Sequence, residues 1–153
     1  MNGPVEEFWA EFLRAEPALL PQTPYQVWYF GNTPEMAREL AELVLHGKKT
    51  ATASLLETNN RQPENAPIGD GFSVVTDMEG IPICVIRTTE ITHTPFCDVD
   101  AAFAYDEGED DRTLTSWRAA HRDYFSREAA ALGFDFDETS IVCCERFRLM
   151  FPK

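Results

Sequence analysis

Two lysines and three hydroxyl side chains lie within the eight-residue run Gly47-Lys48-Lys49-Thr50-Ala51-Thr52-Ala53-Ser54. A lysine beside a threonine hydroxyl can activate that hydroxyl as a nucleophile when the lysine is partly desolvated. Thr50 and Thr52 alternate as strand residues do, which would place both on one face. An ordinary helix end also explains the run, because lysines are favoured near a helix C-terminus. From residue types alone, the helix end is the stronger interpretation.

Residues 98–111 form a second candidate, with seven acidic side chains in fourteen positions. Most of these carboxylates are expected to form a solvated acidic surface. Their spacing does not match a calcium-binding EF-hand loop, and the three histidines lack the spacing of a zinc site. We therefore predict no metal site. One carboxylate of this segment could fold towards Lys49 and serve as an acid/base partner.

An aromatic stripe is the third candidate, because Trp117, His121 and Phe125 recur every four residues and would share one helical face. A core-facing stripe is the favoured interpretation. The functional alternative is a platform on which bases stack, with Arg118 or Arg122 contacting phosphate.

The elements that position these candidates are predicted from hydrophobic spacing and turn residues. We expect strands at 26–30, 71–77, 81–91 and 140–151, and helices over 5–13, 33–47, 99–105 and 113–132, with a polar loop at 57–70. The short helix should begin at Asp98. Thr33 is a suitable N-cap and Gly47 a suitable C-terminal stop, so the lysine run follows a well-defined helix. This mixture predicts an α+β fold with a small, mostly antiparallel sheet or barrel surrounded by helices.

Length and charge limit the classes of function. At 153 residues the chain is expected to be one domain, residues 1–153, in which 1–24 form an N-terminal helical extension. A net charge of −13 argues against binding duplex nucleic acid or an anionic membrane. A local basic cleft for one nucleotide or a short single strand is compatible with this charge. No apolar run is long enough to cross a membrane.

The cysteines indicate a reducing compartment. None of the four forms a CxxC pair, and Cys143 and Cys144 fall in a predicted strand, where neighbours point to opposite faces. The first residues also lack an export signal. We therefore predict a cytoplasmic protein with free thiols.

The run from Gly47 to Thr52 resembles the motif of the ASCH family, a PUA-like group associated with RNA. Further matching segments follow in the same order at 28–31, 69–77, 80–86, 103–109, 114–117, 121–125 and the terminal strand. Together they cover about residues 25–150. The resemblance implies a PUA-like fold, a small β-barrel with helices around it and a cleft beside the lysine run.

The resemblance also implies activities. A longer relative is a ribonuclease acting on single-stranded RNA, and its cleft lysine matches Lys49. Some short ASCH proteins are amidohydrolases that deacetylate acetylcytidine with a lysine, a threonine and a glutamate, which match Lys49, Thr52 and Glu107. We predict a hydrolase acting on single-stranded RNA. The alternatives are an amidohydrolase that deacylates modified nucleosides and a non-catalytic RNA- or nucleotide-binding module.

The predicted site therefore has Lys49, Thr52 and Glu107 as catalytic residues, without metal or other cofactor. Its substrate-binding residues are Lys48, Thr50, Ser54, Trp117, Arg118 and His121. Ser54 stands where the short family motif carries arginine, so a fixed cation is missing. Asp106, Glu109 and Asp110 compete with Glu107 for the acidic role. The sequence gives no oligomeric state.

Overall fold

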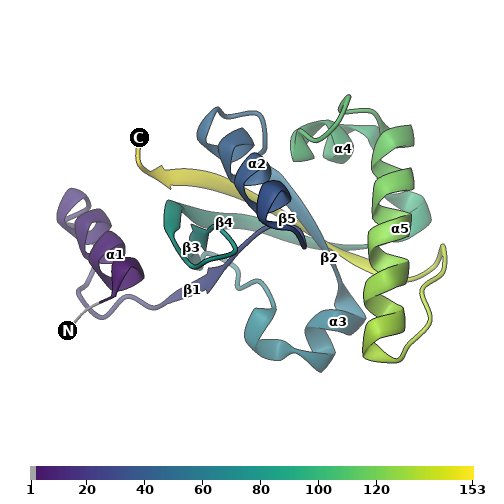
Figure 1. The fold of residues 1–153 in the computed structure, drawn as a ribbon, viewed down its shortest axis with the longest axis horizontal. Helices are drawn as coiled ribbons and strands as arrows, with labels where there is room; N and C mark the ends of the chain where they lie inside the picture. Colours follow the sequence, from purple (N-terminus) through teal and green to yellow (C-terminus); the bar gives the residue numbers. More distant parts are fainter. Residues whose placement is uncertain (1–2) are drawn as a thin grey trace.

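Five strands form one mixed sheet, and helices lie against it in the computed structural model, which describes residues 3–153 (Figure 1). The elements in chain order are α1 (Pro4–Ala15), β1 (Tyr25–Trp28), α2 (Pro34–Leu45), β2 (Ala51–Leu55), α3 (Leu56–Arg61), η1 (Pro63–Asn65), β3 (Phe72–Thr76), β4 (Pro82–Pro95), η2 (Phe96–Asp98), α4 (Ala101–Glu107), α5 (Leu114–Leu132) and β5 (Ile141–Phe151). Residues 1 and 2 of the predicted N-terminal extension lie outside the described residues.

The sheet has the strand order β1-β3-β4-β5-β2. The β1–β3 pairing is parallel and the other pairings are antiparallel, which confirms the predicted α+β class and the mostly antiparallel sheet. The barrel form of the prediction is wrong, because the sheet is not closed. Its edge strands β1 and β2, with four and five residues, pair with β3 and β5 and not with each other.

Three hydrophobic clusters hold the helices against the sheet. Val74 belongs to the cluster of α1 and its neighbour Val75 to the cluster of α2, so these helices cover opposite faces of the sheet. Helices α4 and α5 pack against β2 and β5 in the third cluster. Its largest buried members are Leu55, Phe96, Phe103, Trp117 and Phe125. The aromatic stripe of α5 is thus largely core-facing, as favoured.

Capping residues define the helix that precedes the lysine run. The Thr33 hydroxyl accepts a hydrogen bond from the Met36 amide at 3.1 Å, as predicted for the start of α2. Gly47 follows α2 with a φ of +78°, a conformation that favours glycine. At α4, Asp100 is the N-cap, not Asp98 as predicted, because residues 96–98 form a 3₁₀ turn first.

Two elements differ from the predicted pattern. Residues 51–55 form strand β2, which was not among the predicted strands. The only sequence signal for it was the alternation of Thr50 and Thr52. The start of the predicted loop at 57–70 belongs to helix α3. Hydrogen bonds to residues outside α3 hold this short polar helix in place, since Asn59 donates to Ser54 and Thr58 donates to Glu128 of α5. Among the described residues, no helix is long and apolar enough to cross a membrane.

Gly108 offers a test of how closely α4 approaches the lysine run. Gly108 and Gly133 both follow helices with positive φ, at +71° and +86°. A Cβ on Gly108 would lie 2.3 Å from the Lys48 carbonyl oxygen, whereas one on Gly133 would meet nothing within 4 Å. We expect Gly133→Ala to lower the free energy of unfolding by about 1–2 kcal/mol. Gly108→Ala should cost about 1–3 kcal/mol more, because backbone must move. Urea denaturation measures both, and equal losses would contradict the close approach.

Candidate functional site

Lys49 is enclosed by the protein, with 0% of its side chain exposed, whereas Lys48 is solvated. Both lysines lie in the turn after α2, where their backbone amides donate to the Leu43 carbonyl. This turn places the two side chains in different environments. The Lys49 ammonium lies 3.1 Å from Glu107 Oε1, 2.6 Å from Glu109 Oε2 and 3.4 Å from the Glu107 carbonyl oxygen. An ammonium has three hydrogens, so these three acceptors occupy all of them.

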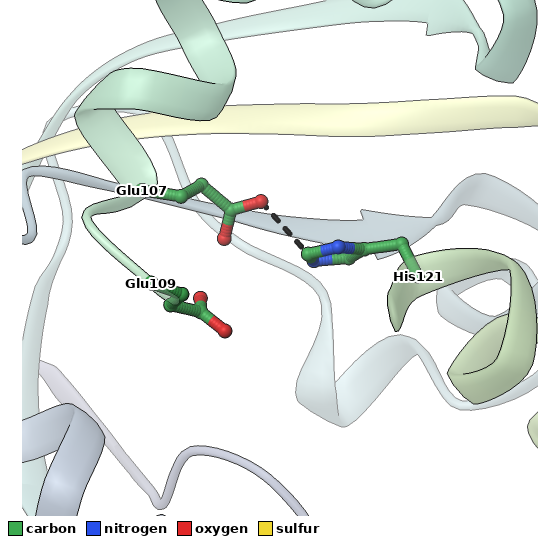
Figure 2. Close-up of side chains that lie close together, drawn as sticks. All are labelled: Glu107, Glu109 and His121. Atoms are coloured by element: carbon green, nitrogen blue, oxygen red, sulfur yellow. Dashed lines mark ion pairs between the residues drawn. The ribbon is translucent and has the colours of Figure 1, made fainter. Parts of the chain in front are cut away.

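Glu107, the last residue of α4, is the centre of this network. Its Oε1 binds Lys49, while Oε2 accepts from the Trp117 indole and lies 3.2 Å from His121 Nε2. Figure 2 shows Glu107 and His121 facing each other, with Glu109 on the loop after α4. Both Glu107 oxygens are therefore occupied, and the predicted acid/base residue has no free oxygen for a substrate.

His121 is held by groups that accept hydrogen bonds. Its ring stacks on Trp117 at 4.2 Å between centroids, and its Nδ1 lies 2.9 Å from the Trp117 carbonyl oxygen. Its Nε2 faces the Glu107 carboxylate. Because both ring nitrogens face acceptors, the doubly protonated imidazolium satisfies the geometry best.

Burial and neighbouring charges act in opposite directions on these groups. Burial alone would lower the pKa values of Lys49 and His121, but the carboxylates outweigh it and raise both. Burial alone would raise the pKa of Glu107, but Lys49 and His121 hold it well below its usual range. The pKa of Glu109 is raised, first by burial and then by the charge of Glu107. Two cations thus balance two carboxylates.

Glu107, Glu109 and His121 also have the donor types of a metal site, with ligand atoms within 4.8 Å of one another. The Lys49 ammonium already binds both carboxylates there. A metal ion would have to displace this ammonium and deprotonate His121, so these residues fit the internal cation better than an added one.

A cleft of about 580 Å³ lies beside the network and between the two edge strands. This volume is within the range of small-molecule pockets, about 300–1,000 Å³. Its lining residues come from β1 and the segment after it, from β2, from α3 and the segment after it, from α5 and β5, and from the end of β3 and the β3–β4 turn. Those with polar or aromatic side chains include Gln26, Trp28, Tyr29, Phe30, Thr52, Ser54, Thr58, Asn59, Gln62, Asn65, Thr76, Tyr124, Phe125, Glu128 and Glu145. The Phe30 ring also lies 5.2 Å from the Lys49 ammonium, so one wall of the cleft borders the network.

The structure divides the predicted site residues into three groups. Lys49, Glu107, Trp117 and His121 meet in the buried network. Thr52 and Ser54 line the cleft. The remaining predicted residues, Lys48, Thr50 and Arg118, line neither.

Thr50 and Lys48 are exposed, and the Thr50 hydroxyl donates to the Asp106 carbonyl. The Arg118 guanidinium donates to the Cys97 carbonyl at 3.0 Å, which ties it to the chain before α4. None of these three residues lines the cleft, so their substrate-binding roles stay predictions.

Two acidic residues of the site were not assigned roles from the sequence. Glu109 was only a competitor of Glu107, yet both bind Lys49. Glu145 was missed; it lines the cleft on β5, directly opposite Thr52 of β2, and is buried. Its sequence signal is that it is the one acidic side chain within the predicted strand at 140–151.

The ASCH domain family model matches residues 26–150, so the chain belongs to the ASCH domain family. Among solved structures it is similar to an ASCH domain from Lactobacillus crispatus JV V101, with 31% identity, a TM-score of 0.87, and coverage of 98% of this chain and 96% of that one. It is also similar to a protein from Enterococcus faecalis V583, with 33% identity, a TM-score of 0.85, and coverage of 95% and 87%. A search of curated proteins gives no match.

The charge balance of the network predicts a large effect of Glu107→Gln. This change leaves the Lys49 and His121 charges without their shared partner. We expect the free energy of unfolding to fall by about 3–5 kcal/mol. Adding Lys49→Met should recover part of the loss, because the unpaired ammonium is then removed. Chemical denaturation of both single variants and the double variant measures the coupling; strictly additive losses would contradict it.

His121 predicts a pH dependence of stability. Its folded-state pKa is raised, so its stabilising effect is complete below the ordinary histidine pKa of about 6.5. The effect is lost as pH rises through the raised value. The stability advantage of the wild type over His121→Gln should therefore shrink between pH 6 and the alkaline end of a denaturation series to about pH 9. A constant advantage would show that folding does not change the pKa of His121, and a growing one that folding lowers it; either contradicts the prediction.

Proposed function

We propose that the cleft binds a nucleoside and that the protein hydrolyses an acyl amide on it, as an amidohydrolase of acetylcytidine-type substrates. The observation that carries this proposal is the lining of the cleft. It combines side-chain amides, hydroxyls and aromatic rings with the carboxylates Glu128 and Glu145, and it includes no lysine or arginine among residues 3–153. Such a surface suits an uncharged heterocycle with many hydrogen-bonding groups better than a chain of phosphates.

Thr52 is the proposed nucleophile, because it is the family-matched hydroxyl that faces the cleft. Its oxygen would attack the acyl carbon, and the C–N bond would break as the hydroxyl proton passes to the nucleoside nitrogen, which leaves as the free amine. Water then hydrolyses the resulting ester to acetate and restores the Thr52 hydroxyl. Because Glu107 and Glu109 raise the pKa of Lys49 against the effect of burial, Lys49 acts in the proposal as a cation that stabilises the developing oxyanion, not as a base.

Lys49 can reach a substrate only by exchanging one of its present acceptors. Glu109 is the partner suited to leave, because 25% of its side chain is exposed, compared with 1% for Glu107. Glu107 is then a positioning residue that keeps the ammonium in place. This differs from the acid/base role that the family resemblance implies for it.

The second candidate function is cleavage of single-stranded RNA, and the aromatic side chains of the cleft favour it. Trp28, Tyr29 and Tyr124 contribute to the lining, and 44% of Tyr29 is exposed. Bases of a single strand stack on such rings irrespective of sequence. We rank this function second, because no lysine or arginine among residues 3–153 lines the cleft to bind the phosphates.

The test compares wild-type protein with Thr52→Val and with Thr50→Val, a matched change outside the cleft. Each is incubated with acetylcytidine and with labelled single-stranded RNA, with and without EDTA. We expect acetate release by the wild type and Thr50→Val, and a loss of about 10³-fold or more in Thr52→Val. EDTA should have no effect. Equal turnover in Thr52→Val would contradict the proposal, and Thr52-dependent RNA cleavage without acetate release would favour the ribonuclease.

A further inference from the structure

The proposed hydrolysis needs a group that carries the Thr52 proton to the leaving nitrogen, and the ion network does not provide one. The three hydrogens of the Lys49 ammonium are all donated, so this group has no place for a further proton. Both oxygens of Glu107 are also occupied, by hydrogen-bond donors of the network. The proton carrier must therefore be one of the other residues that line the cleft.

Glu145 of β5 is a carboxylate that lies beside the Thr52 hydroxyl. The two residues are directly opposite each other in the β2–β5 register, and both line the cleft. Directly opposite residues of antiparallel strands have Cβ atoms about 4.5–5.5 Å apart. The hydrogen bond that the Glu145 carboxylate accepts within residues 3–153 comes from Thr88. Proton transfer from Thr52 therefore needs a side-chain rotation or one intervening water, as is common before a substrate binds.

The surroundings of the Glu145 carboxylate suit a general base. Its Oε2 accepts a hydrogen bond from the Thr88 hydroxyl at 2.6 Å, which anchors one oxygen and leaves Oε1 for proton transfer. Burial raises the pKa of Glu145, although the Thr88 hydrogen bond and the charge of Lys49 oppose this rise. A raised pKa brings a carboxylate closer to neutral pH, where general base catalysis is most effective.

Glu128, the other carboxylate of the lining, is less suited to this role. It belongs to α5, so no strand register holds it beside Thr52, and its Oε1 already accepts from Thr58 at 2.7 Å. Glu145 is also the more buried of the two, since it is 6% exposed whereas Glu128 is half-buried. The fold therefore fixes Glu145, and not Glu128, relative to the proposed nucleophile.

We infer that Glu145 is the general base and general acid of the proposed hydrolysis. It takes the proton from the Thr52 hydroxyl as the Thr52 oxygen attacks the acyl carbon, and it gives this proton to the nucleoside nitrogen as the C–N bond breaks. In the second half of the reaction it takes a proton from the attacking water and returns it to the Thr52 oxygen as the ester bond breaks. This inference rests on the proposed function, and it moves the acid/base role from Glu107 to a residue of β5.

The experiment measures acetate release from acetylcytidine at pH 7.5 by the wild type and by variants of Glu145. Glu145→Gln keeps the volume of the side chain and an acceptor for Thr88, but its amide does not take up a proton. We expect this change to lower kcat by about 10²-fold or more while KM changes by less than about threefold. Glu90→Gln, an exposed change on β4, is the matched control and should keep the turnover of the wild type.

Added formate separates proton transfer from a structural effect of the same residue. Glu145→Ala leaves space in the cleft for a small carboxylate, so formate should raise its turnover by at least about tenfold. Formate should not restore Glu145→Gln, whose side chain fills this space, or Thr52→Val, which lacks the nucleophile. Thermal melts identify a variant that does not fold. If Glu145→Ala is such a variant, the loss of kcat at unchanged KM in Glu145→Gln decides.

The outcomes distinguish the role of Glu145 from the hydrolysis itself. Turnover of Glu145→Gln within about threefold of the wild type, or an equal loss in Glu90→Gln, would overturn the role of Glu145 and leave the hydrolysis standing. The same conclusion follows if formate does not restore a folded Glu145→Ala. No acetate release by the wild type would instead reject the proposed hydrolysis, and the proton transfer with it.

Discussion

The site depends on the burial of one ammonium, that of Lys49, against the Glu107 carboxylate. Taking either charge out of water alone is highly unfavourable, and only excellent geometry with full hydrogen bonding offsets this cost. Three acceptors at the ammonium and occupied oxygens at Glu107 meet that condition. The turn after α2, the end of α4 and the aromatic face of α5 must therefore come together in one arrangement.

The network and the cleft have different electrostatic characters although they share the wall at Phe30. The network is largely buried and balanced in charge, while the cleft is polar and acidic through Glu128 and Glu145. Thr52 lies on the cleft side and Lys49 on the network side. Chemistry that uses both must bring a substrate to the boundary between them, and Glu109 is the more exposed of the two carboxylates that bind Lys49.

Local signals in the sequence predicted the elements well. Thr33 and Gly47 define α2 because capping is decided within a few residues, and apolar, β-branched runs bounded by turn residues located β3, β4 and β5. The same signals placed Lys49 and Lys48 just after α2. They could not tell which lysine turns inward, because this depends on the distant Glu107 and on the absence of a Cβ at Gly108.

The parts that the sequence did not predict are those decided by tertiary contacts. Helix α3 is too short and polar to be indicated by its own residues, and Glu128 of α5 helps to hold it. The sheet is open because its two short edge strands, β1 and β2, do not pair with each other. Glu145 lies opposite Thr52 only because β2 pairs with β5, a pairing that neither segment indicates by itself. Trp117 packs in the core, as its spacing favoured, and it also donates to Glu107, which its spacing did not indicate.

The separation of Lys49 and Glu107 by 58 residues has a consequence for the order of folding. A contact between such distant positions forms only after a long loop has closed. Until then, each charge is more stable in water, so neither segment gains by burying its half of the pair. We expect α4, the following loop and the lysine turn to dock as one cooperative unit, whose amides exchange hydrogen together. The residues proposed for chemistry would then be assembled or dismantled in a single step.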